Sequence, residues 1–157
     1  MALGRRKREQ QSLLVATTSL PQSPGHPFYA RLNRLLGEVR FEEFVEGLCR
    51  PFYAEGVGRP GIAPGAYFRM LFIGYFEGLD SQRAIAWRGH DRRSLQEFLG
   101  YSIVDPTPDH SSLTVIRQRL PLSIHEQVFS QVLAIAQEKK LLKGKTVAVD
   151  STLIEAE

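Results

Sequence analysis

Cysteine is almost absent from this chain, which has a single one, Cys49, among 157 residues. One cysteine cannot form an internal disulfide, and no pairs of Cys and His stand at the spacing of a zinc site, so a reducing cytosol is the default setting. Cys49 itself is expected to be a small, buried, apolar side chain. The sequence therefore argues against a disulfide-stapled scaffold and against a structural zinc site.

Long hydrophobic runs are also missing. The most apolar segment, Tyr67–Leu79, has about thirteen residues where a membrane span needs about twenty, and Arg69 and Glu77 interrupt it. Arg5–Arg8 precedes Leu13–Ala16 in the manner of a signal peptide, but that apolar run has about four residues where a signal peptide needs about seven or more. We expect no membrane partner and a cytoplasmic location. The basic arm either lies on DNA phosphates or is a solvated tail.

Charge of one sign is not in large excess. The chain has 20 Lys and Arg against 17 Asp and Glu, for a net charge of +3 and a pI near 9.2, which permits nucleic-acid binding without requiring it. There is no glycine-rich phosphate loop, no internal repeat and no Ser/His/Asp order typical of a hydrolase. His90-Asp91 and Asp109-His110 have no second partner at helical spacing, so they are expected to be solvated loop residues.

Prolines and glycines divide the chain into short segments. Pro21–Pro27 holds three prolines and a glycine and is expected to be a linker, so folding starts after it. Apolar residues then recur at three- and four-residue spacing, and Tyr67–Leu79, apolar on most faces, is expected to be a central core helix. The expected helices cover residues 28–37, 41–48, 67–79, 82–88, 95–99 and 108–120, and a longer helix follows Ser123.

Several residues indicate where these helices begin or end. Ser81 and Ser94 are each expected to cap the helix that follows, and Gly100 is expected to end the second of these helices. The other expected start signals are Pro64 and Pro108 in a first turn, and Ser123 with Glu126 as a capping box.

The helix expected at 108–120 carries the residues best suited to DNA. Leu113, Ile116 and Leu120 form its apolar face, which leaves hydroxyl and guanidinium groups on the other faces, where they suit phosphates and guanine edges. Together with the preceding short helices it makes a helix-turn-helix candidate, although many helical proteins show short helices joined by polar turns. The candidate DNA-binding residues are Arg92, Arg93, Ser112, Thr114, Arg117 and Arg119.

A short strand-like run, Lys145–Asp150, ends in an aspartate. Metal-dependent nucleases carry Mg²⁺-binding carboxylates at the ends of strands, where a rigid sheet holds the oxygens within coordination distance. One aspartate cannot make such a site, and only Glu155 and Glu157 follow it in this chain. The alternative is that Asp150 merely starts a turn after an edge strand.

Taken together, a series of short motifs resembles bacterial insertion-sequence transposases of the DDE class. The resemblance spans nearly the whole chain and rests on the order and spacing of the motifs. They are His26-Pro27-Phe28-Tyr29, Gly58-Arg59-Pro60, Tyr67-Phe68-Arg69-Met70, Gly74-Tyr75-Phe76-Glu77-Gly78, Ser81-Gln82-Arg83, Phe98-Leu99-Gly100-Tyr101, Pro106-Thr107-Pro108-Asp109-His110-Ser111 and Leu142-Lys143-Gly144-Lys145.

The resemblance implies a mainly α fold: a helical N-terminal transposase domain with a helix-turn-helix-like part, which leads into the first β-strand of a truncated ribonuclease-H-like domain. On this reading residues 1–27 are a flexible basic arm and linker, 28–143 the helical domain and 144–157 the first strand. Asp150 matches one of the family's three catalytic acids, and its implied role is to bind Mg²⁺ in the complete enzyme. The chain alone is expected to need no cofactor.

The function that the resemblance implies is binding of double-stranded DNA at transposon ends, near the bacterial nucleoid, without cleavage by this chain alone. The remaining transposase chain, or a homo-oligomer, is an expected partner. Where family members continue as Asp-small-Thr-Thr-Leu-Glu-Ala-Asn, this chain has Leu153–Glu157 in place of the last residues. Two alternatives stay open: a non-catalytic fragment that represses transposition by binding DNA or another chain, and a decayed copy.

Overall fold

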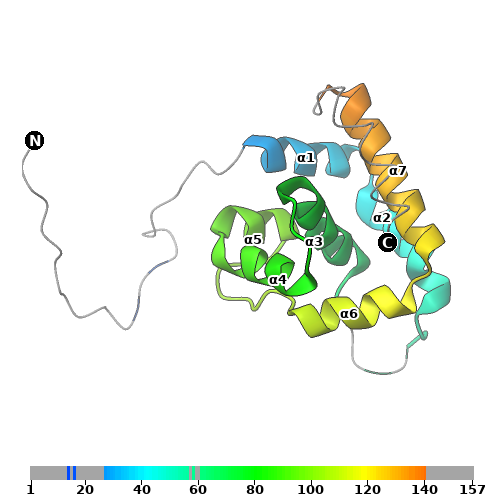
Figure 1. Cartoon of the computed structure of the whole chain (residues 1–157), viewed down its shortest axis with the longest axis horizontal. Helices are drawn as coiled ribbons and strands as arrows, with labels where there is room; N and C mark the ends of the chain where they lie inside the picture. Colours follow the sequence, from blue (N-terminus) through cyan, green and yellow to red (C-terminus); the bar gives the residue numbers. More distant parts are fainter. Residues whose placement is uncertain (1–13, 15, 17–26, 57, 59–60, 141–157) are drawn as a thin grey trace, which may run out of the picture.

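The structure of the protein is a computed structural model that describes residues 14, 16, 27–56, 58 and 61–140. This part is mainly helical, with seven α-helices, one 3₁₀ turn and no strand, which confirms the expected mainly α class (Figure 1). The expected strand at 144–157, with Asp150, and nearly all of the expected arm and linker lie outside the described residues. The helices are α1 (Pro27–Glu38), α2 (Phe41–Cys49), η2 (Arg50–Phe52), α3 (Pro64–Glu77), α4 (Gln82–Asp91), α5 (Arg93–Leu99), α6 (His110–Arg119) and α7 (Leu122–Glu138).

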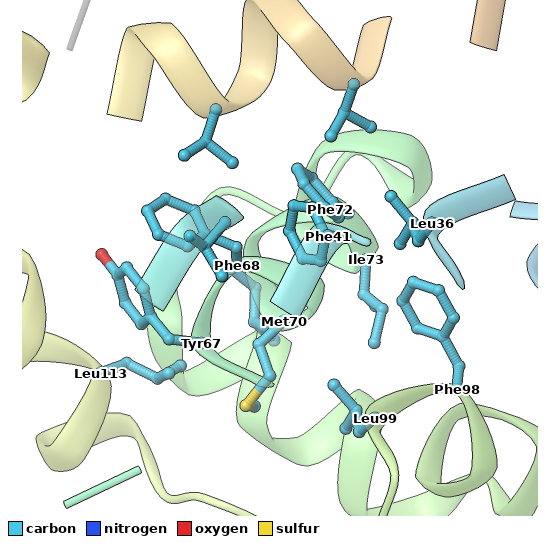
Figure 2. Packing of buried hydrophobic residues seen from close by; sticks show 14 of the residues in the cluster. Leu36, Phe41, Tyr67, Phe68, Met70, Phe72, Ile73, Phe98, Leu99 and Leu113 are labelled. Carbon is cyan, nitrogen blue, oxygen red and sulfur yellow. The ribbon is translucent and has the colours of Figure 1, made fainter. Parts of the chain in front are cut away.

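Helix α3 is the central element, as its apolar pattern predicted. It lies between α1 on one side and α6 on the other, with α4 and α5 beside it and α7 along the far edge (Figure 1). Its side chains converge with those of neighbouring helices, among them Phe41, Phe98 and Leu113 (Figure 2). The least exposed α3 side chains, at 0 or 1%, are Tyr67, Phe68, Met70, Phe72 and Ile73.

Arg69 and Tyr67 of α3 make polar contacts with other helices. Arg69, which is 9% exposed, forms an ion pair with Glu42 of α2 and donates from Nε and Nη2 to Asn33 Oδ1 of α1, both at 3.3 Å. The Tyr67 hydroxyl lies 2.8 Å from His125 Nε2 of α7, and His125 Nδ1 lies 3.1 Å from the Pro121 carbonyl. If Nδ1 carries the proton, it donates to Pro121 and Nε2 accepts from Tyr67, so all three groups are satisfied.

Some helix ends match the expectation. Ser81 Oγ accepts from the backbone N–H of Ala84 at 3.1 Å, which confirms Ser81 as the cap of α4. Gly100, at a φ of 84°, ends α5 in the left-handed conformation that favours glycine. Pro64 occupies the first turn of α3. Cys49 is 1% exposed, as expected of a buried apolar side chain, and burial raises the pKa of its thiol to about 11.

Three other expected helix starts were wrong. Arg92 rather than Ser94 precedes α5, because the Arg92 carbonyl already accepts from the N–H groups of Leu95 and Gln96, at 3.1 and 3.0 Å. Pro121 precedes α7, so Ser123 already lies in its first turn and no capping box forms. Pro108 lies outside α6, whose cap is Asp109: its Oδ1 accepts from Ser112 N–H at 2.8 Å.

Candidate nucleic-acid interface

Helix α6 is held in place by its cap and by its apolar face. Leu113, Ile116 and Leu120 are at most 5% exposed, which confirms the face that the sequence predicted. At the start of the helix, Ser112 N–H and the Ser111 hydroxyl both donate to the Asp109 carboxylate, and these hydrogen bonds lower the pKa of Asp109 below its ordinary value. The helix is therefore anchored at its N-terminus and along one side, and it exposes Ser111, Val115, Arg117 and Arg119.

The four candidate residues of α6 fall on two sides of the helix. Ser112 and Arg119, which are two turns apart, line the same groove. Thr114 instead faces α4, because its hydroxyl hydrogen-bonds to Gln82 Oε1 and lies 3.0 Å from the His110 carbonyl. Arg117 is exposed and does not line the groove. The structure thus brings together two of the four.

The groove has a volume of about 1110 Å³ and lies between α6 and the segment that follows η2. Its aromatic residues come from two separate stretches of chain, Phe52 and Tyr53 from one and Tyr101 from the other. The Arg119 guanidinium carbon lies 4.9 Å from the centre of the Tyr53 ring. The lining residues that the structure describes are Phe52, Tyr53, Ala54, Gly56, Gly58, Gly61, Ile62, Tyr101, Ser111, Ser112, Val115, Ile116 and Arg119.

The electrostatics of the groove favour an anion. Arg119 is the only charged residue among the lining residues just named, and none of them carries a carboxylate. Burial is the main cause that raises the pKa of Tyr53, and the charge of the nearby Arg119 acts in the opposite direction. Burial also raises the pKa of Tyr101, with a smaller contribution from Asp105. Both phenols therefore stay neutral at physiological pH.

Arg92 and Arg93 lie elsewhere, where α4 passes into α5. Arg92 Nη1 donates to Glu77 Oε1 at 3.1 Å, and Arg88 Nε lies 3.5 Å from Glu77 Oε2. One carboxylate thus faces two guanidinium groups.

These two arginines are separated from Thr114 by the length of α4. Gln82 at the start of α4 contacts Thr114, whereas His90 near its end lies 3.4 Å from Thr107, before α6 begins. Helices α4 and α6 therefore run side by side in opposite directions. At about 1.5 Å per residue, Arg92 lies about 15 Å along α4 from Gln82. The expected candidates form three separate groups rather than one surface.

The aromatic wall of the groove was not among the residues expected from the sequence. Phe52 and Tyr53 directly follow Pro51 at the end of a helix, and Tyr101 directly follows the helix-ending Gly100. The sequence signal that could have identified these residues is an aromatic side chain directly after a helix end, where few other residues can cover it.

Metal ligands are not clustered in the described part of the chain, where no group of three or more His, Cys, Asp and Glu side chains is placed to hold an ion. The expectation that His90, Asp91 and His110 are loop residues was wrong, because His90 and Asp91 lie in α4 and His110 begins α6. Within the same described segments, every helix is too short or too polar to cross a membrane.

The fold and the groove define a mainly helical domain with a positively charged, aromatic site beside α6. Residues 18–119, which are more than half of the chain, match the family described as transposase domain (DUF772), and the chain belongs to that family. The matched region includes α1 to α6 and all six candidate DNA-binding residues. No curated protein and no solved structure matches the chain.

Proposed function

We propose that this chain is the N-terminal part of a DDE transposase of the insertion-sequence type and binds double-stranded DNA at transposon ends. The observation that carries the proposal is that α6, inside the transposase domain, ends in Arg117 and Arg119 and borders a groove with no described carboxylate. Guanidinium groups on an exposed helix suit phosphate oxygens and guanine edges. The helix-turn-helix-like role of α4 to α6 is part of this proposal.

The test compares two double substitutions that remove the same charge. Arg117→Gln with Arg119→Gln is expected to weaken binding to a short duplex at low ionic strength by about tenfold or more, as each lost phosphate contact weakens attraction to all sequences. The control is Arg31→Gln with Arg34→Gln, because these exposed residues lie on α1, across α3 from α6. Fluorescence anisotropy measures both. Equal effects of the two variants would dismiss α6 as the contact.

The catalytic part of the proposal concerns Asp150, which lies outside the described residues. We propose that it contributes one carboxylate to a Mg²⁺ site together with two further acids of a ribonuclease-H-like domain. A bound pair of such ions would activate the attacking hydroxyl and stabilise the leaving oxygen. Because only Asp150 matches one of the three acids, incubation of the 157-residue chain with Mg²⁺ and duplex DNA is expected to give no strand cleavage; reproducible cleavage that chelation abolishes would contradict this.

A further inference from the structure

We propose that the groove beside α6 receives one unpaired nucleotide of the bound DNA, with its base stacked against the aromatic wall. The inference rests on the proposed function, because it takes DNA as the ligand. It adds that the site binds an unpaired base rather than the outer surface of a duplex. Its supports are the aromatic rings, the charge and the size of the groove.

Two aromatic rings of the groove can act as a stacking platform. Phe52 is 37% exposed, and Tyr101 is half-buried and packs against the core, so part of each ring remains accessible. Tyr53 packs against the core and lies under the Arg119 guanidinium group. Bases stack on such rings whatever their identity, since every base has a π-face. A partly covered ring is also pre-organised, which lowers the entropic cost of binding.

The polar groups of the groove match the rest of a nucleotide. Arg119 is the single described charge in the lining, and its guanidinium group stacks on Tyr53 while its N–H edge remains suited to a phosphate. Ser112, in the first turn of α6, adds a hydroxyl that can donate to or accept from a base edge. A ligand that offers only an acidic group, or only apolar surface, would contact some of these aromatic, charged and hydroxyl groups and leave the others unused.

The groove is large enough for a nucleotide. Its volume of about 1110 Å³ is close to the upper end of the roughly 300–1000 Å³ that small-molecule sites occupy. Bases inside a duplex show only their edges, so one must leave the stack before its face can meet a tyrosine. Gly56, Gly58 and Gly61 form part of the lining, and a Cβ atom built on any of them meets no atom within 4 Å. The lining there leaves room for a sugar-phosphate backbone.

The experiment measures the affinity of the full 157-residue chain for two DNA probes at low ionic strength. One probe is a blunt duplex, and the other is the same duplex with a run of unpaired thymidines at one end. The wild-type chain is expected to bind the second probe about tenfold more tightly, a typical effect of one stacked base. Val115→Glu and Phe52→Ala are each expected to abolish that preference, because Val115 is 54% exposed in the groove and Phe52 belongs to its wall.

The matched control is Val104→Glu, which makes the same charge change at a residue that is 80% exposed and outside the groove lining. It is expected to keep the preference and to report the general effect of one added carboxylate on duplex binding. Thermal melts establish that all three variants fold. If the wild-type chain binds both probes equally, or both groove variants keep the preference, the groove inference is overturned and the proposed function stands. If the wild-type chain binds neither probe, the proposed function fails.

Discussion

Arg69 is the only charged residue that is buried among the described residues, and its surroundings show what the charge requires. Its guanidinium group pairs with Glu42, contacts Asn33, and lies 5.2 Å from the centre of the Phe41 ring and 5.8 Å from that of Phe98. An arginine can stay charged at such a site only if its donors are satisfied. Arg69 therefore ties α1, α2 and α5 to α3.

Removal of the Glu42 carboxylate should destabilise the fold more than removal of its neighbour. Glu42→Ala leaves a guanidinium group that is 10% exposed without its anion, and because Glu42 itself is half-exposed we expect a loss of about 2 kcal/mol in the free energy of unfolding. Glu43→Ala breaks only the exposed pair with Arg40, which is expected to cost no more than about 0.5 kcal/mol. Chemical denaturation measures both.

The comparison is matched because both glutamates lie in the first turn of α2 and lose the same interaction with the helix dipole. Losses of equal size would show that the buried pair adds nothing beyond that dipole interaction.

At this scale the sequence predicted what depends on residue type alone. The burial of Cys49 was predictable because a lone cysteine behaves as a small apolar side chain. The burial of Arg69 was not, because its partners Asn33 and Glu42 come from two other helices and no local spacing relates them to it.

At the scale of helices, Asp109 should give α6 a dependence on pH. Because hydrogen bonds from Ser112 and Ser111 hold its pKa below the unfolded value, the ionised carboxylate stabilises the folded state. That contribution is complete above the unfolded pKa of about 4 and is lost as pH falls through the lower folded-state pKa. The wild-type melting temperature is expected to exceed that of Asp109→Asn near neutral pH and to approach it in acid; a difference that does not change with pH would contradict the assignment.

Close approach of α3 and α4 gives a second prediction about helices. A Cβ atom on Gly74 would lie 2.5 and 2.8 Å from Ile85 Cδ1 and Cγ1, so Gly74→Ala is expected to destabilise the protein by about 1–3 kcal/mol despite alanine's better helix propensity. Gly47→Ala is the control, because Gly47 lies in α2 with no atom within 4 Å of its added Cβ. It should stabilise by roughly 0.5–1 kcal/mol. Thermal or chemical unfolding gives both signs, and a neutral Gly74→Ala would mean that α4 shifts to relieve the clash.

Helix positions were more predictable than helix starts. The apolar pattern placed α3 within a few residues, since burial on most faces leaves a clear signal. Ser81 was identified correctly as a cap, whereas Ser94 was not, because α5 is capped by Arg92, two residues before Ser94. A polar residue near a helix start acts as a cap only if its own backbone is extended. Whether the backbone is extended there depends on tertiary packing.

At the scale of the whole molecule, the groove is assembled from three distant stretches. Phe52 and Tyr53, then Tyr101, then Ser112 and Arg119 meet only because α6 packs beside the segment after η2. The sequence supplied the polar residues of α6 but could not indicate which of its faces was open. Thr114 is an example: the sequence identified it as a candidate, but its hydroxyl interacts within the fold with Gln82 and the His110 carbonyl.

The balance of charge over the whole molecule leads to the last prediction. The net charge is only +3, so any DNA affinity must come from local groups such as Arg117 and Arg119 rather than from a general positive field. For each phosphate that such a group neutralises, the logarithm of the association constant should fall by about 0.9 per unit of log salt concentration. The double substitution Arg117→Gln and Arg119→Gln should then reduce that slope by about 1 to 2, whereas Arg31→Gln with Arg34→Gln should leave it unchanged. Anisotropy titrations over a range of salt give these slopes. A weaker affinity with an unchanged slope would mean that Arg119 supports the groove through Tyr53 and that neither α6 arginine contacts a phosphate.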